Sequence, residues 1–293
     1  MPEFSEMQLQ EGRRKRRWKY ITILLYAVTT LMCLNIIKDV LVFPASYQMG
    51  DPRHIELTVS RYHELKRQEK SPKSMPLSIF TKYQEHRVVR LTHLLPAAVW
   101  SGAIPLQLHP GLRSKCPQIH RMAGYAFFTS SFLLMIGLGF IISRGLMCSR
   151  HDFPPLGVPM PHRKFSIASV EIANEELVAI AMGMWFTYTA LVAVLAARRG
   201  DFVRHQKFAV RHIGSGIWVA IHRLLFVDML SQNWDDPPAR VKNNFDKATL
   251  VSLAICTFVA ELVVRRGALA VKRQHEATKT SQLTTKIVMK KVQ

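Results

Sequence analysis

The sequence is short of acidic residues. Aspartate and glutamate number 20 against 40 lysines and arginines, which gives a formal net charge of +20. In a soluble protein, a positive charge of this size suggests a nucleic-acid partner. No module that interleaves basic and aromatic residues is present, however, and the lysines and arginines mostly flank apolar stretches. We therefore expect no nucleic-acid partner.

Cysteine is also scarce, and internal repeats are absent. The four cysteines form no CxxC pair. Zinc sites and disulfide frameworks need cysteines in a regular pattern. Two of the four, Cys33 and Cys256, lie inside apolar stretches, where a free thiol behaves as a small hydrophobic group. The sequence indicates neither a zinc site nor a disulfide framework.

Charge is missing altogether from three long apolar stretches. At ~1.5 Å per residue, about 20 helical residues cross a hydrocarbon core of ~30 Å. The uncharged stretches have 18, 22 and 21 residues, in the order Tyr20–Ile37, Met122–Ser143 and Leu177–Ala197. Three more are interrupted by polar residues: Leu91–Leu108, Phe208–Val227 and Ala248–Val264. The predicted fold class is all-α, a polytopic membrane bundle of about six transmembrane helices. A soluble all-α protein with buried helices is the alternative.

The basic residues predict the orientation of this bundle. Six spans place 22 basic residues on the side of the two termini and 16 on the other, nine of which lie in the long segment 45–90. Positive residues in short loops favour the cytosolic side, and long loops count little. The predicted order is a basic cytosolic tail 1–18, a first transmembrane helix 19–44, a soluble loop 45–88, a five-helix membrane core 89–264 and a basic cytosolic tail 265–293. Prolines exclude a helix from most of loop 145–175.

The C-terminal sequence suggests a location. Lys290 and Lys291 stand fourth and third from the end, as in the dilysine signal of endoplasmic-reticulum membrane proteins, which a receptor reads on a cytosolic tail. In a eukaryotic cell we therefore expect a multi-pass protein of the endoplasmic-reticulum membrane. A basic tail without any such signal is the alternative.

Histidines in the apolar stretches are the most informative feature, because ionisable groups at membrane depth are costly and usually functional. Distances along the predicted helices sort them into an outer set, His93 and His222, and an inner set, His120, His205 and His212. Imidazoles on separate helices can hold haem iron from both sides. The predicted axial pairs are His93 with His222 and His120 with His205. For His212 we favour a plain polar contact between helices.

Two arginines accompany these histidines. Arg211 and Arg223 cannot be neutralised, so each needs an anionic partner. Haem propionates would serve, as would Glu261, Asp228 or a lipid phosphate. The predicted cofactor-binding residues are therefore the four paired histidines with Arg211 and Arg223. The glycines within the apolar stretches allow either close helix packing or the approach of a flat ligand.

Three motifs resemble those of a family of integral membrane proteins known as domain of unknown function 2306. They are Arg90-Leu91-Thr92-His93 followed by Trp100 and Gly102, His120-Arg121-Met122-Ala123-Gly124-Tyr125, and Arg199-Gly200-Asp201 followed by His205-Gln206-Lys207-Phe208-Ala209-Val210-Arg211. The resemblance covers residues 88–230. The chain departs from the family pattern at Phe208 and Ala209, where Trp and Met are expected. The resemblance implies a membrane architecture and no defined activity.

Three functions remain open at this point. The favoured one is binding of one or two b-type haems, with electrons passed across or along the bilayer between a small-molecule donor and acceptor; the helices are broadly similar in plan to those of cytochrome b561. A channel or transporter with histidines and arginines along a polar path is the second. The third is a structural membrane protein with histidines in interhelical hydrogen bonds. Enzymatic activity and oligomeric state are not indicated by the sequence.

Overall fold

The computed structural model describes residues 26–34, 86–109, 115–148, 164–167, 170–230 and 240–266, together with a few single residues. The ends of the predicted span Tyr20–Ile37 and most of loop 45–88 lie outside the described residues. So do tail 1–18 and most of tail 265–293, including Lys290 and Lys291.

The described chain is built mainly from helices. Residues 26–34 are helical, and further helices follow along the chain: α4 (Arg87–Val89), the π-helix η1 (Arg90–Leu94), α5 (Leu95–Leu108), α7 (Pro117–Ser143), α8 (Asn174–Arg198), α9 (Phe202–Leu230) and a C-terminal helix, Arg240–Arg266. Strands β1 (Lys164–Ile167) and β2 (Val170–Ala173) pair antiparallel immediately before α8, with Ile167 opposite Val170. This hairpin lies within the loop that was predicted only to be non-helical.

Three of these helices are long and apolar enough to cross a membrane: Pro117–Ser143, Glu176–Arg198 and Arg240–Arg266. They contain the predicted spans Met122–Ser143, Leu177–Ala197 and Ala248–Val264. The prediction of an α-helical membrane protein is confirmed at this level. Helix α9 has the length of a span, but Arg204, Lys207, Arg211 and Arg223 interrupt its apolar character.

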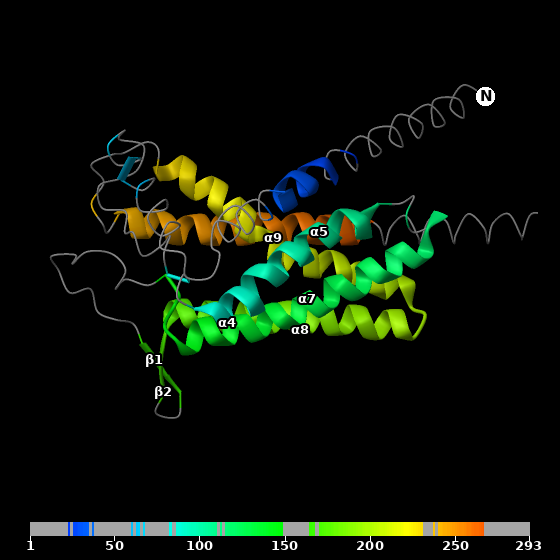
Figure 1. Ribbon diagram of the computed structural model, residues 1–293, viewed down its shortest axis with the longest axis horizontal. Helices are drawn as coiled ribbons and strands as arrows, with labels where there is room; N and C mark the ends of the chain where they lie inside the picture. Colours follow the sequence, from blue (N-terminus) through cyan, green and yellow to red (C-terminus); the bar gives the residue numbers. More distant parts are fainter. Residues whose placement is uncertain are drawn as a thin grey trace, which may run out of the picture.

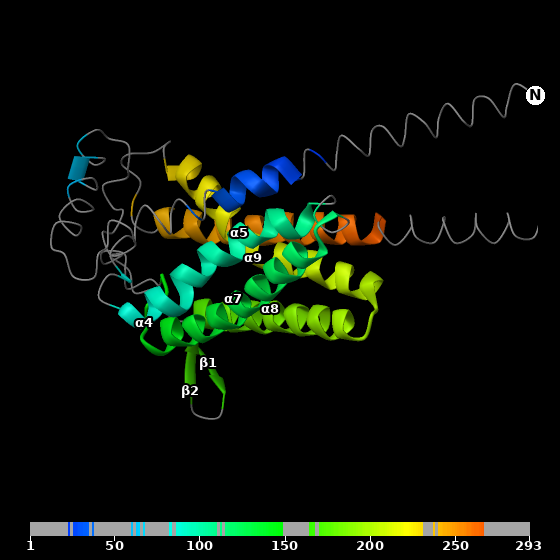
Figure 2. The same cartoon turned by 45° about the vertical axis from the view of Figure 1, so that its right-hand side comes forward.

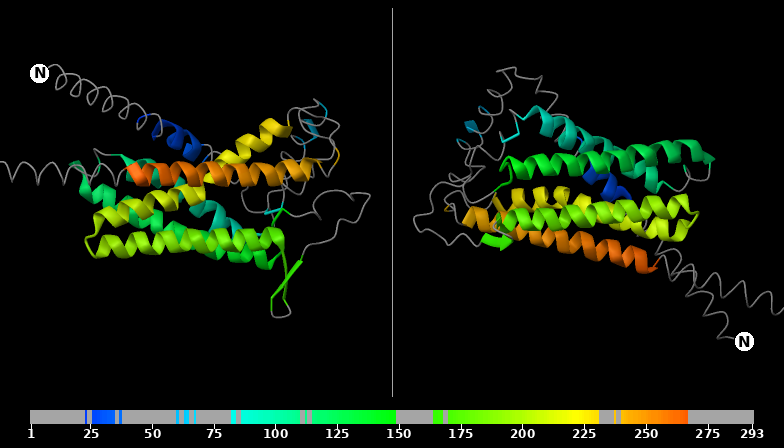
Figure 3. Two further views of the ribbon diagram at one scale, coloured as in Figure 1. Left: turned by 180° about the vertical axis from the view of Figure 1, so that it is seen from behind. Right: turned by 90° about the horizontal axis from the view of Figure 1, so that it is seen from below.

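The helices lie along one common direction and reverse at each connection (Figure 1). Helix α5 packs against α7, and α8 packs against α9. The view turned by 45° and the views from behind and from below show the same arrangement (Figures 2 and 3). The first residues of α7, the α8–α9 connection and the end of the C-terminal helix lie at the same end of the bundle.

One hydrophobic core joins all six helical segments. Cys33 of the first segment, Trp100 of α5, Phe127 of α7, Phe186 of α8, Ile217 of α9 and Cys256 of the C-terminal helix are buried in a single cluster. Many large apolar side chains point outward instead, among them Met122, Met184 and Phe258 at 70, 63 and 69 % exposure. A buried centre inside an apolar exterior is the pattern of a helix bundle surrounded by lipid.

The π-helix η1 has a local cause. Pro96 follows it by two residues, and proline has no N–H to donate to the carbonyl four residues earlier, that of Thr92. Its ring also collides with that carbonyl in a regular α-helix. A wide turn relieves the collision, and π-turns of this kind occur often at functional sites. The Thr92 hydroxyl donates to the Val88 carbonyl at 2.7 Å.

Candidate functional site

His212 is the largest fully buried polar side chain among the described residues. Its ring is contacted by residues of three other helices. Trp100 approaches from α5, Ser131 from α7, and Phe186 and Thr189 from α8. The side chain therefore stands where four helices meet.

Hydrogen bonds define the protonation of this imidazole. Nδ1 lies 3.0 Å from the Phe186 carbonyl oxygen. A carbonyl only accepts, so Nδ1 carries the hydrogen and Nε2 is the acceptor. Trp100 Nε1 donates to Nε2 at 3.3 Å, and Ser131 Oγ lies 2.7 Å from the same atom. His212 is a neutral imidazole with both nitrogens engaged.

Aromatic rings close the space around His212. The ring centroid of Phe186 lies 4.0 Å from that of the imidazole, that of Phe127 lies 5.2 Å away, and those of Phe128 and Trp100 lie at 5.8 and 6.0 Å. Such a dry surrounding strongly disfavours the charged imidazolium. The expectation that His212 forms a polar contact between helices agrees with this geometry.

His93, of the predicted outer set, lies in the π-helix η1 and is held against α7. Its Nδ1 lies 3.1 Å from the Leu134 carbonyl, so this imidazole also donates through Nδ1. The backbone of α7 approaches it very closely at Gly137. A Cβ on that glycine would lie 2.5 Å from the His93 Cβ, well inside van der Waals contact. Only glycine permits this approach of α7 to η1.

His222, the other member of the outer set, is held against the C-terminal helix. It is buried, hydrogen-bonded to the Phe245 backbone, and packed edge-on against the Phe245 ring at 4.6 Å. The two outer histidines are therefore each held against a different helix, His93 against α7 and His222 against the C-terminal helix.

Of the predicted inner set, His120 and His205 lie at the opposite end of the bundle, where α7 and α9 begin, whereas His212 lies in the buried centre. His205 Nδ1 lies 2.9 Å from the Ala193 carbonyl of α8, and its ring lies 6.3 Å from that of Phe128. His120 is in the first turn of α7, and its backbone carbonyl accepts a hydrogen bond from the Gln107 side chain at 2.6 Å. His205 thus contacts α7 and α8, while the backbone of His120 contacts α5.

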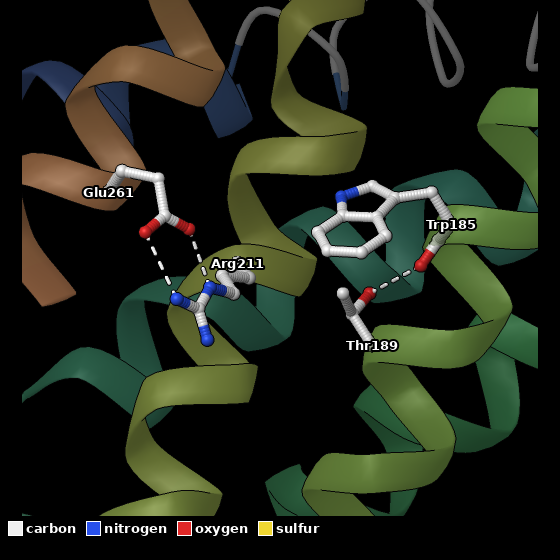
Figure 4. A network of polar contacts seen from close by, with 4 residues as sticks. All are labelled: Trp185, Thr189, Arg211 and Glu261. Carbon is white, nitrogen blue, oxygen red and sulfur yellow. Dashed lines mark hydrogen bonds and ion pairs between the residues drawn. The ribbon is translucent and has the colours of Figure 1, made fainter.

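Arg211 is paired with Glu261, one of the four anionic partners that the sequence left open. Its guanidinium forms a two-point ion pair with Glu261 of the C-terminal helix, Nε to Oε1 at 2.5 Å and Nη2 to Oε2 at 3.0 Å (Figure 4). Two parallel bonds hold both side chains in one orientation. Of the partners considered for Arg211, the structure therefore supplies the glutamate. Figure 4 also shows the Thr189 hydroxyl bonded to the Trp185 carbonyl at 3.0 Å.

A haem b site sets two geometric requirements that can be compared with these histidines. The first is a ring nitrogen left as an acceptor for iron, usually fixed by a bond from the other nitrogen to a carbonyl. His93 and His205 meet it, because each donates through Nδ1. The second is that two imidazoles face one iron from opposite sides. The Nδ1 bond holds His93 against α7, and the ring of His222 packs against Phe245 of the C-terminal helix. The bonds of His93 and His205 thus fit the first requirement, and the predicted axial pairs stay predictions.

Several residues of the His212 cluster were not predicted. Ser131, Thr189, Phe127 and Phe186 carry no pattern that separates them from other small or aromatic residues in a membrane helix. Trp100 was noted only as part of the family motif. Among the described residues there is no group of three or more histidine, cysteine or acidic side chains close enough to hold a metal ion.

Comparison with known proteins adds no relative. No family model matches the chain, and neither the curated proteins nor the solved structures include a match. The resemblance to domain of unknown function 2306 therefore stays a prediction, and the functional argument depends on the residues themselves.

Proposed function

We propose that this chain is a six-span membrane protein of the structural class, whose buried and partly buried histidines join the helices to one another as neutral hydrogen-bond donors. One recurring observation supports it. The rings of His93, His205, His212 and His222 each bond to the backbone of a neighbouring helix, at Leu134, Ala193, Phe186 and Phe245. A helical carbonyl has a second lone pair that can accept such a bond.

The surroundings of His212 favour this class over a channel or transporter. A conducting path needs polar groups and water through the middle of the bundle. At the level of His212 the described interior is occupied by Trp100, Phe127 and Phe186, whose rings pack against the imidazole and against one another. These rings leave the imidazole in a dry and closed setting.

The three apolar helices and the alternating direction of the others support the proposal of six spans. The segments that include 26–34, 87–108 and 202–230 run beside the candidate spans. With the termini in the cytosol, we expect tags in loop 45–88 and tags after residue 270 to label from opposite sides of the membrane. Cysteine-accessibility labelling in intact and opened vesicles measures this. Labelling from one side only would mean that one of the polar segments, 91–108 or 208–227, does not cross.

Haem binding is the second candidate, because His93 and His205 have the Nδ1 bonds that orient a ligating imidazole. A bound haem would supply one-electron chemistry, and these residues would supply axial nitrogens. Location in the endoplasmic-reticulum membrane through Lys290 and Lys291 stays a prediction of the sequence.

Substitution of His205 separates the two candidates. Asparagine keeps a side-chain N–H where histidine has Nδ1, but it has no counterpart of Nε2. If the bond to Ala193 is the purpose of His205, His205→Ala should lower the melting temperature in mild detergent by roughly 3 °C and His205→Asn should restore most of it. The exposed His109, which lies just beyond α5, provides a comparison. Its ring accepts a hydrogen bond from the Leu112 backbone N–H and lies edge-on to Tyr26, and His109→Ala should lower the melting temperature by less than His205→Ala does.

Absorption spectra of the same preparations complete the experiment. Under haem-replete expression, the structural proposal expects no Soret band in the oxidised or the dithionite-reduced protein. A haem site would instead give a Soret band that both His205→Ala and His205→Asn weaken, since neither variant retains Nε2. A band of that behaviour would replace the structural proposal with the haem one.

A further inference from the structure

A basic pocket lies at the end of the bundle where α8 turns into α9. Helix α8 ends at Arg198, α9 begins at Phe202, and the C-terminal helix ends at Arg266. The basic pocket is an open surface hollow of about 500 Å³ between the last two of these helices. Four of its lining residues are cationic, namely Arg204, Lys207, Arg211 and Arg265, and one is acidic, Asp201.

The two nearby carboxylates are already occupied, and they do not neutralise the pocket. Asp201 accepts a hydrogen bond from the Arg204 backbone N–H at 2.9 Å and thereby caps the start of α9. Glu261 holds Arg211 in the two-point ion pair. Four cations against these two carboxylates leave two positive charges in excess.

Two of the four cationic groups, Arg204 and Arg211, are also held in place. The Arg204 and Arg211 guanidiniums both lie over the Phe208 ring, at 5.9 and 5.1 Å from its centroid. Stacking and the ion pair with Glu261 reduce the conformational freedom that a ligand would otherwise have to remove. Planar guanidiniums fixed around a pocket suit a tetrahedral oxyanion, which accepts several N–H bonds at once.

The position of the pocket favours a ligand at the membrane surface. Two of the three candidate spans end beside it, at Arg198 and Arg266, so it lies at the depth of lipid phosphates. Val203 and Val264 add apolar area to its lining. Basic clusters at this depth attract anionic lipid headgroups, with each charge contributing on the order of 1 kcal/mol near the surface.

We propose that this pocket binds a phosphate group carried by an anionic lipid headgroup or by a soluble phosphate compound. The site is separate from the histidine cluster around His212 and depends only on the membrane placement of the helices. If His205 did not act through its hydrogen bond to Ala193, the pocket could still bind phosphate. If the pocket bound no phosphate, the proposed role of His205 would be unaffected.

The test uses the full chain in an uncharged detergent and two matched double variants. Lys207→Gln with Arg265→Gln removes two pocket charges while sparing the Arg211–Glu261 pair. Arg198→Gln with Arg199→Gln removes two exposed charges at the same end of the bundle, outside the pocket lining.

The melting temperature without ligand reports whether each variant keeps its fold. Binding is then measured as thermal stabilisation by phosphatidic acid, by phosphatidylcholine, and by inorganic phosphate against chloride at equal ionic strength.

We expect phosphatidic acid to stabilise the chain more than phosphatidylcholine does, and the pocket variant to weaken that binding roughly tenfold. The control variant should keep it. Stabilisation by phosphatidic acid alone identifies a lipid headgroup as the source of the phosphate, whereas stabilisation by inorganic phosphate as well identifies a soluble phosphate compound. Equal loss in both variants, or no stabilisation by either phosphate probe, would overturn the proposal.

Discussion

His212→Ala is expected to lower the free energy of unfolding by roughly 3 kcal/mol, the sum of a cavity and several broken hydrogen bonds. The imidazole fills the space between the Phe127 and Phe186 rings, so its removal leaves a void that four packed helices cannot easily close. It also leaves the Trp100 N–H without its acceptor at Nε2. Thermal unfolding in mild detergent, followed by intrinsic tryptophan fluorescence, measures the change.

The matched variant for this experiment is His205→Ala. His205 is only partly buried, and its ring bonds to a single helix. Its loss should cost on the order of 1 kcal/mol, as is usual for one interhelical hydrogen bond in a membrane. Equal losses from the two variants would show that the cluster around His212 is no more than one ordinary polar contact.

Gly137→Ala is expected to destabilise the bundle by roughly 3 kcal/mol, because its methyl group has no room. The new Cβ would lie 2.5 Å from the His93 Cβ and 2.8 Å from both the His93 backbone nitrogen and the Thr92 carbonyl carbon. Two of these three are backbone atoms, which no rotamer change can move. The helix α7 would have to separate from η1, and the bond between His93 and Leu134 would be lost with that movement.

Gly139 provides the control on the same helix. A Cβ at Gly139 meets no atom within 4 Å. Since alanine favours a helix over glycine by about 1 kcal/mol, Gly139→Ala should leave the melting temperature unchanged or raise it slightly. Comparable destabilisation by both variants would mean that α7 is sensitive to any alanine and that the approach to His93 is not special.

Length and hydropathy were sufficient to predict the coarse fold. The uncharged stretches Met122–Ser143 and Leu177–Ala197 lie within α7 and α8, because a helix is the only single-segment structure that satisfies its own backbone in lipid. The β1–β2 hairpin was not predicted. Its strands, Lys164–Ile167 and Val170–Ala173, do largely alternate polar and apolar residues, which is the period of a strand, but each run has only four residues and the pattern was overlooked next to the prolines of loop 145–175.

The candidate site was less accessible to sequence reasoning. Pattern alone marked the histidines and Arg211, since polar residues inside apolar stretches stand out. It could not assign partners, because the bond from His212 to Phe186 joins residues on two helices and involves a backbone carbonyl that every residue has. The haem pairs were chosen by depth, and depth does not determine which way a ring points around a helix. His222 packs against Phe245 of the C-terminal helix, whereas Ala220, two residues earlier, packs against Leu94 of η1 and Ala97 of α5.

From the sequence, Gly137 and Gly139 had the same interpretation: each could allow close helix packing or the approach of a flat ligand. Their surroundings in the structure differ. Gly137 and Gly139 are two residues apart, so they face different sides of α7. Only Gly137 lies against another helix. A stretch of sequence shows that small residues are present but does not show which side of the helix a neighbour occupies.

The wide turn at Arg90–Leu94 makes the bundle sensitive to chain length at one place. A π-turn accommodates about one residue more than the α-helix it interrupts, and each residue rotates the following helix by about 100° about its axis. The additional residue therefore sets the direction in which the side chains of α5 point, including that of Trp100 toward the interior. Deleting one residue from this segment would rotate the indole away from His212 without altering any side chain of the cluster, so the spacing between Val89 and Trp100 is as much a part of this core as the residues that fill it.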